Sequence, residues 1–172
     1  MLRGALGSRC FRPIFTMRLC QWASNSRLRP LLPVFMALHW MASSLGGMEL
    51  PWRANVGAGF AIHHGYGLVV SPGARIGRNV TMLHGATLGR RDSLGPDLDS
   101  PRVSGFPTIE DEVWIGPHAV ILGGITVGRG SRIAAGAVVV ADVPPHSLVA
   151  GNPGRILRSN CRPDVFNPAR LA

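Results

Sequence analysis

The chain has 172 residues with 22 glycines and 14 prolines, and 46% of its residues are apolar. The apolar content excludes a disordered Gly/Pro tract, and the glycine and proline content favours a regular, turn-rich β architecture over a helical domain. All 18 basic residues are arginine and the formal net charge is +9, which indicates an anionic partner or biased codon usage. No motif for binding nucleic acid is present, so we do not expect nucleic acid as a partner.

Residues 1–48 contain six arginines and no acidic residue. An apolar helix is expected over 28–45, with Pro30 and Pro33 near its first turn and a stop at Gly46 and Gly47. A shorter helix is expected over 15–22. Two interpretations apply: a helical cap on the open end of a repeat fold, or a basic amphipathic segment in peripheral contact with a membrane.

From Val56 onward, aliphatic residues recur with a period of six, which neither a helix nor an ordinary strand produces. The later series has no slip: Ile109, Ile115, Ile121, Val127, Ile133 and Val139. The earlier series is Val56, Ile62 and Leu68, and after a two-residue slip Ile76, Met82 and Leu88. A hexapeptide period predicts an all-β protein, namely a left-handed parallel β-helix over residues 49–157. The lead aliphatic residues point into the β-helix, and the short helical cap precedes it. The hexads pause at a predicted functional loop over 90–107, and 158–172 form a C-terminal tail.

Three cysteines, Cys10, Cys20 and Cys161, have no metal-ligand spacing and fit a reducing compartment. No apolar run reaches the roughly 18 residues that span a membrane, and the start does not look like a secretory signal. We therefore expect a cytoplasmic protein, with the inner face of the membrane as a further location.

Six histidines are present, and the pair His63 and His64 is the most informative. Strand alternation predicts that the two rings point to opposite faces, and His84 follows about one coil later. Three interpretations apply: a neutral imidazole acting as general base in acyl transfer, a three-histidine zinc site of the kind found in β-helical carbonic anhydrases, or hydrogen-bonded structural histidines. His118 and His146 are interpreted as turn residues.

Residues 49–157 resemble the serine acetyltransferase family of hexapeptide acyltransferases. The resemblance is carried by the segments 62–67 (IHHGYG), 74–77 (ARIG), 85–89 (GATLG), 121–130 (ILGGITVGRG) and 143–157 (VPPHSLVAGNPGRIL). It implies that His64 is the catalytic base and that Glu49, fifteen positions earlier, is the carboxylate that orients it. The family's aspartate before the base is replaced here by His63.

The chain departs from that family at Gly105 and Phe106, where an Arg-His pair that holds the amino-acid substrate is expected. The short N-terminal region, Glu49 and His84 give the chain a closer resemblance to the colanic-acid and exopolysaccharide acetyltransferases. This resemblance implies a sugar hydroxyl of an exopolysaccharide or lipid-linked glycan as acceptor, with L-serine as the alternative. His63, His84 and Tyr66 are expected to line the acceptor pocket.

The resemblance also implies acetyl-CoA as donor, bound between neighbouring β-helices of a homotrimer, with no metal ion. The expected CoA-binding residues are small ones that permit close approach and one arginine for the phosphates: Gly89, Ala135, Gly136, Gly151 and Arg155. A carbonic anhydrase and a non-catalytic scaffold are the remaining alternatives.

Overall fold

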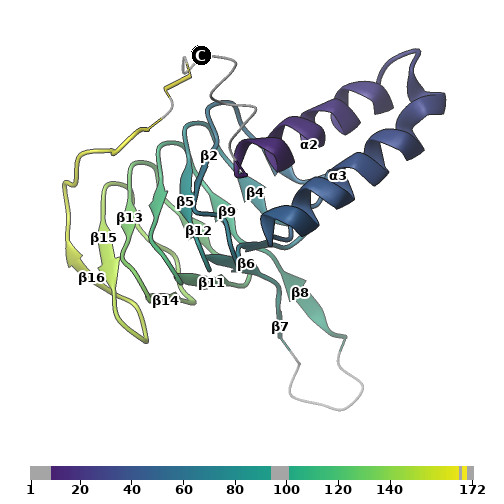
Figure 1. The fold of residues 1–172 in the computed structure, drawn as a ribbon. Helices are drawn as coiled ribbons and strands as arrows, with labels where there is room; N and C mark the ends of the chain where they lie inside the picture. The colour runs from purple at the N-terminus through teal and green to yellow at the C-terminus, as the bar shows by residue number, and fades with distance from the viewer. Residues whose placement is uncertain (1–8, 94–100, 167, 170–172) are drawn as a thin grey trace.

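The computed structural model describes residues 9–93, 101–166 and 168–169, and three sheets wound coil by coil form its body (Figure 1). The first sheet contains β1 (Asn55–Val56), β4 (Arg75–Ile76), β9 (Thr108–Ile109) and β12 (Thr126–Val127). The second contains β2 (Ala61–His63), β5 (Thr81–Leu83), β10 (Trp114–Ile115), β13 (Arg132–Ile133), β15 (Leu148–Ala150) and β16 (Arg155–Arg158). The third contains β3 (Val69–Val70), β6 (Thr87–Gly89), β11 (Val120–Leu122) and β14 (Val138–Val139). This is the predicted left-handed parallel β-helix.

The lead aliphatics of successive coils stack on one another inside the β-helix. Ile115 pairs with Ile133, and Ile121 pairs with Val139, each 18 residues further along the chain. Ile115, Ile121 and Ile133 are fully buried. Burial of such side chains contributes roughly 1.5–3 kcal/mol each relative to exposure, so the stack is the main source of stability.

The two extra residues of the first coil lie earlier than the sequence predicts. Val70, and not Leu68, pairs with Leu88, while Ile62 pairs with Met82. The insertion therefore falls between Ile62 and Val70, in the corner that carries His64. The hexad pattern misplaced it because Leu68 is also fully buried and looks like a lead residue.

The N-terminal region forms two helices, as predicted, which run antiparallel and are joined by a short turn (Figure 1). They are α2 (Phe11–Ser24), the 3-10 turn η1 (Arg29–Leu31) and α3 (Leu32–Gly46). Arg18 of α2 donates to the carbonyl oxygens of Val56 and Gly57, both at 2.7 Å, and burial lowers the pKa of its guanidinium. Gln21 donates to the carbonyls of Trp52 and Ala54, both at 3.0 Å. Polar side chains of α2 thereby satisfy backbone groups at the open end of the β-helix.

The predicted loop is an antiparallel hairpin that leaves the third sheet, with 94–100 outside the described residues. Its strands are β7 (Arg91–Ser93) and β8 (Val103–Gly105). Asp92 joins them, because it accepts a hydrogen bond from Ser104 and pairs with Arg90 at 3.0 Å and Arg102 at 3.4 Å. The hairpin projects away from the coils (Figure 1).

After β16 the chain runs back along the β-helix toward the first coils (Figure 1). Asp164 pairs with Arg132 at 3.1 Å. The Asn79 side chain exchanges two hydrogen bonds with the backbone of Ala169, at 2.9 and 2.6 Å. Ala169 of the tail therefore lies beside the coils that carry His63 and His84.

Candidate active site

The enlarged corner between β2 and β3 is held in place by the end of the helical cap. His64 adopts the left-handed conformation with φ 55°, which ends the strand at β2 and projects its exposed side chain outward. The next residue, Gly65, donates its backbone N–H to Cys10 Sγ at 3.3 Å. Gly67 donates to the carbonyl of Gly47 at 2.7 Å. Both sides of the corner are thus tied to residues that precede the first coil.

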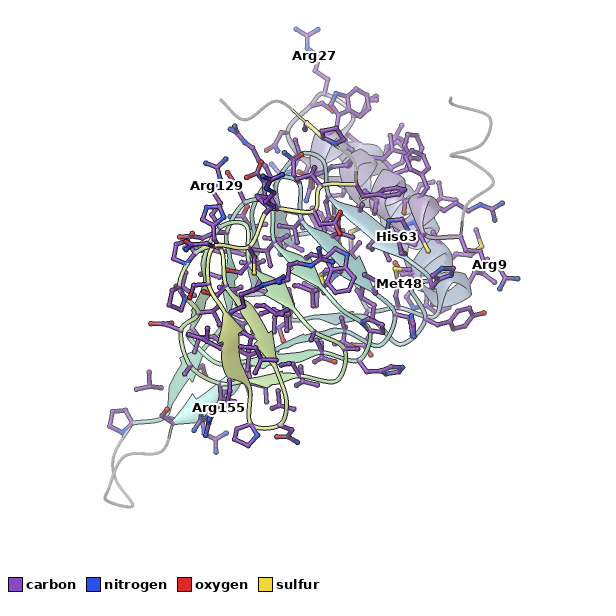
Figure 2. The ribbon with its side chains drawn as sticks, turned by 90° about the vertical axis from the view of Figure 1, so that its left-hand side faces the viewer. Arg9, Arg27, Met48, His63, Arg129 and Arg155 are labelled. Carbon is purple, nitrogen blue, oxygen red and sulfur yellow. The ribbon has the colours of Figure 1, made fainter. Side chains whose placement is uncertain are left out.

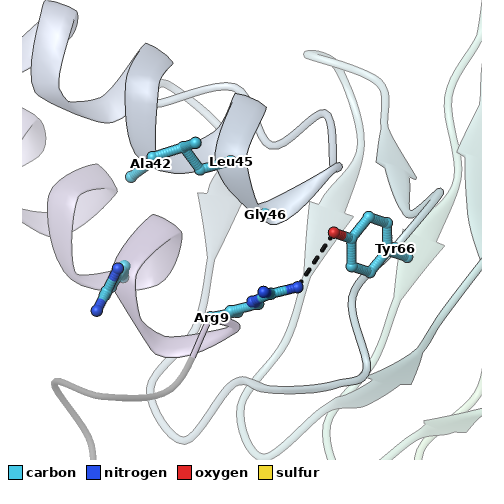
Figure 3. A pocket seen from close by; sticks show the side chains of 6 residues that line it. Arg9, Ala42, Leu45, Gly46 and Tyr66 are labelled. Atoms are coloured by element: carbon cyan, nitrogen blue, oxygen red, sulfur yellow. Dashed lines mark hydrogen bonds between the residues drawn. The ribbon is translucent and has the colours of Figure 1, made fainter.

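A cavity of about 390 Å³ opens at this corner. Its lining residues come from the start of α2, the end of α3 and the corner itself: Arg9, Cys10, Gly46, Ile62, His63, His64, Gly65 and Tyr66. A second cavity of about 370 Å³ shares Arg9, Gly46 and Tyr66 with it (Figure 3). The structure thus brings three predicted site residues, His63, His64 and Tyr66, to one cavity. Strand alternation predicted opposite directions for the two histidines, but the left-handed turn at His64 interrupts it.

Three histidines follow one another along this corner of the β-helix. The ring centroids of His64 and His84 are 6.4 Å apart, and those of His84 and His118 are 5.0 Å apart. The sequence singled out His84 but treated His118 only as a turn residue. It is a turn residue with φ 55°, yet it also contacts the site histidine His84. Only the register across the hairpin insertion reveals this contact.

Two imidazole nitrogens near the cavity are buried without a hydrogen-bond partner among the described residues, namely His63 Nε2 and His84 Nδ1. Buried polar atoms of native proteins are nearly always paired, so each is a candidate contact for a ligand. His63 also packs edge-on against Phe166 of the tail, with centroids 4.1 Å apart. In the part of the chain that the structure describes, no three His, Cys, Asp or Glu side chains are placed to hold a metal ion.

Glu49 does not reach His64 in this structure. Its backbone pairs with Leu68 and Val70, and its exposed side chain lines a different groove between α3 and the first coil. The carboxylate makes no hydrogen bond with any described residue. Its role as the orienting carboxylate stays a prediction.

The predicted CoA-binding residues lie further along the β-helix. Gly136 has φ 67°, and a Cβ there would meet nothing within 4 Å, so its surface is open to a ligand. Arg155 lies on β16, at the opposite edge of the second sheet from His63 on β2 (Figure 2). Gly151 has φ 92° and Ala135 is exposed, whereas a Cβ on Gly89 would overlap Leu122. Packing against Leu122 therefore explains the glycine at position 89 without a role in CoA binding.

The chain is similar to known proteins over this same region. Residues 106–141 match the bacterial transferase hexapeptide family, described as six repeats. Its β-helix is that of the hexapeptide-repeat transferases. The chain is 41% identical over 124 residues to a serine acetyltransferase of Bacillus licheniformis, covering 72% of this chain and 54% of the relative. It spans about half the length of the curated relatives it matches.

Solved structures agree with this assignment to the hexapeptide-repeat transferases. A serine acetyltransferase from Brucella abortus in complex with coenzyme A is 35% identical with a TM-score of 0.71, covering 89% of this chain and 58% of that one. Soybean serine acetyltransferase complexed with serine is 34% identical with a TM-score of 0.72, covering 88% and 58%. The solved structures similar to this chain thus include serine acetyltransferases with each of these ligands bound.

The predicted preference for a sugar acceptor and the exopolysaccharide-like character are wrong. The curated relatives, at 33–42% identity, are named serine acetyltransferases. The preference rested in part on Gly105 and Phe106, and both of these residues have packing reasons. A Cβ on Gly105 would overlap the backbone of Gly124, and the Phe106 ring lies against Gly73. Coil packing therefore gives both positions a structural reason.

The corner's dependence on Gly47 can be measured. Gly47 has φ 63°, and a Cβ there would lie 2.6 Å from the Tyr66 ring. We expect Gly47→Ala to lower the free energy of unfolding by at least about 1 kcal/mol, since a left-handed residue with a Cβ costs that much before the clash. Urea denaturation is the measurement.

Gly46→Ala is the matched control, because Gly46 is helical and its Cβ would meet the Met48 and Pro13 side chains at 3.2 and 3.3 Å and the backbone oxygen of Arg9 at 3.6 Å, with no closer contact. It is expected to stay within about 1 kcal/mol of the wild type. Equal effects of the two substitutions would contradict this account of the corner.

Proposed function

We propose that the chain is a serine O-acetyltransferase, which converts L-serine and acetyl-CoA to O-acetylserine and CoA. The observation that carries the proposal is the cavity at the enlarged corner, where exposed His64 lies beside His63 and Tyr66. The aligned relatives named serine acetyltransferase, one bound to serine and one to coenzyme A, support the choice of acceptor and donor.

His64 acts as the general base in this mechanism. A neutral imidazole nitrogen accepts the proton of the serine hydroxyl as its oxygen attacks the thioester carbonyl. The tetrahedral intermediate then expels the CoA thiolate. The thiolate accepts the proton from the imidazolium, which releases CoA as the thiol and restores the neutral base. The buried, unpaired nitrogens of His63 and His84, together with the Tyr66 hydroxyl, are the groups that hydrogen-bond the acceptor. Glu49 would orient His64 after a movement of its exposed side chain.

Acetyl-CoA lies along the β-helix in this proposal, between neighbouring copies of a homotrimer. His63 and Arg155 are on strands at opposite edges of a six-stranded sheet. Five strand spacings of about 4.8 Å separate them by roughly 24 Å, a span that an extended CoA can cover. The thioester would then lie at the His64 corner, with pantetheine near Gly136 and phosphates near Arg155.

The base is tested by His64→Asn, with His146→Asn as control. Both histidines are left-handed corner residues, with φ 55° and 57°, and asparagine tolerates that conformation, so the two changes are matched in backbone cost. His146 is a turn residue that bonds the carbonyl of Cys161. We expect His64→Asn to lower kcat with L-serine by about 10²–10⁴-fold, the usual contribution of a general base. Thiol release from acetyl-CoA is the measurement.

Retention of serine-dependent thiol release in His64→Asn would rule out His64 as the base. No release by the wild type with L-serine would contradict the proposed function as a whole. Glu49→Gln in the same assay tests the orienting carboxylate, whose loss should lower kcat without changing the KM for acetyl-CoA.

We also propose that the helical hairpin lies on an anionic membrane surface. Along η1 and α3, the apolar residues Leu31, Val34, Leu38, Met41 and Leu45 follow at alternating spacings of three and four and are all exposed. Trp40, 73% exposed, and Trp22, 55% exposed, add aromatic groups of the kind found at membrane interfaces. Residues 1–48 supply six arginines and no carboxylate, which complements anionic lipid. Among the described helices, none is long and apolar enough to cross a bilayer.

Sedimentation with lipid vesicles tests this placement. We expect the wild type to bind vesicles that contain phosphatidylserine and to bind pure phosphatidylcholine vesicles at least several-fold more weakly. The double variant Leu38→Glu, Met41→Glu should lose binding. A matched double variant elsewhere, Val103→Glu with Ile156→Glu, also replaces exposed apolar residues and should retain it. Equal binding by both variants would contradict the proposal, as would a self-association that only the helix variant abolishes.

A further inference from the structure

We propose that Arg9 is the cation that binds the carboxylate of the amino-acid acceptor, an assignment that rests on the proposed function. L-Serine carries a carboxylate that must be paired when it enters a protein cavity. Among the described residues that line the His64 cavity, Arg9 is the one arginine, and none is a lysine, aspartate or glutamate. The acceptor's negative group and its reacting hydroxyl therefore have separate partners, Arg9 and His64, in one cavity.

The position of Arg9 is fixed relative to the corner. Its Nη1 donates to the hydroxyl of Tyr66 at 3.2 Å, and Tyr66 is two residues after His64 (Figure 3). The next residue, Cys10, accepts the hydrogen bond from the backbone N–H of Gly65. Figure 2 shows Arg9 on the same side of the molecule as Met48 and His63. The guanidinium is thus attached to the same corner as the proposed base.

Among the residues that the structure describes, no acidic side chain neutralises Arg9. Glu49 is the first acidic residue of the chain and Asp92 is the second, and Glu49 lines a different groove. Apart from the bond to Tyr66, the guanidinium makes no hydrogen bond or ion pair with the described residues. Its remaining N–H groups form the planar fork that matches a carboxylate in two parallel hydrogen bonds.

The helical cap thereby supplies the clamp that the β-helix lacks. The Arg-His pair expected from the resemblance is replaced by Gly105 and Phe106, which are fixed by packing. Tyr66 acts as a positioning residue for Arg9, and its ring lies against Gly47, where no Cβ intervenes. A cavity of about 390 Å³ is larger than serine and leaves room for the thioester.

The experiment compares Arg9→Gln with Arg27→Gln in steady-state assays of the full chain. Arg27 is an exposed arginine at the outer end of the helical hairpin (Figure 2). Its replacement by glutamine changes the net charge as much as Arg9→Gln does. We expect Arg9→Gln to raise the KM for L-serine by about 10- to 100-fold, the range for a lost hydrogen bond to a charged group. The KM for acetyl-CoA should stay unchanged. The KM of Arg9→Lys for L-serine should lie between those of the wild type and Arg9→Gln, because lysine keeps the charge but lacks the planar fork of the guanidinium.

L-Serinamide, which keeps the hydroxyl and the amine but lacks the carboxylate, separates the possible causes. Arg9→Gln should change kcat/KM for serinamide less than about 3-fold, since no carboxylate is present to lose its partner. An equal loss with both acceptors would overturn the assignment and make Arg9 a structural residue, as would equal behaviour of Arg9→Gln and Arg27→Gln with L-serine. Serine turnover by the wild type in those cases would leave the proposed function standing. No serine turnover by the wild type would overturn both. Thermal unfolding of each variant checks that it is folded.

Discussion

Parallel pairing of very short strands is the constraint on which the rest of this structure depends. Each strand has only two to four residues, so its backbone groups are satisfied by the coils above and below and not by a long ladder of its own. An 18-residue coil keeps the inward aliphatics in line, as between Ile115 and Ile133. The arrangement leaves an open end at the first coil, where carbonyl groups lack a coil beneath them. Arg18 and Gln21 of α2 close that end through side-chain hydrogen bonds, so the helical cap completes the β-helix and is more than an appendage.

The proposed chemistry occurs where the coil departs from its 18-residue length. Eight residues separate Ile62 from Val70, whereas six separate Met82 from Leu88, to which the two pair. The two extra residues push a corner outward and place His64 on a left-handed turn beside the ends of both helices. The core below tolerates this because Leu68, inside the enlarged corner, is still fully buried. One insertion therefore yields an exposed imidazole without loss of packing.

The sequence predicted the fold well because the hexad period directly reports the inward positions, and proline and glycine marked the limits of α3. It placed the two-residue insertion one hexad late, since Leu68 and Val70 are both buried and a period cannot choose between them. The contact of His118 with His84 depends on how many residues the β7–β8 hairpin inserts between two coils, and the sequence does not give that number. The position of Arg9 depends on tertiary contacts with Tyr66 and Gly65, and no local pattern carries such information. The acceptor was misjudged because the loss of the Arg-His pair at Gly105 and Phe106 was given more weight than the motifs shared with the serine acetyltransferases.

In the proposed mechanism, acetyl-CoA and serine meet at the enlarged corner. The most direct measurement is a crystal structure of the chain with CoA and L-serine bound. We expect the serine hydroxyl to lie within about 3 Å of a His64 nitrogen, with the CoA sulfur on its other side. Serine bound away from His64, or a CoA thiol end distant from this corner, would contradict it.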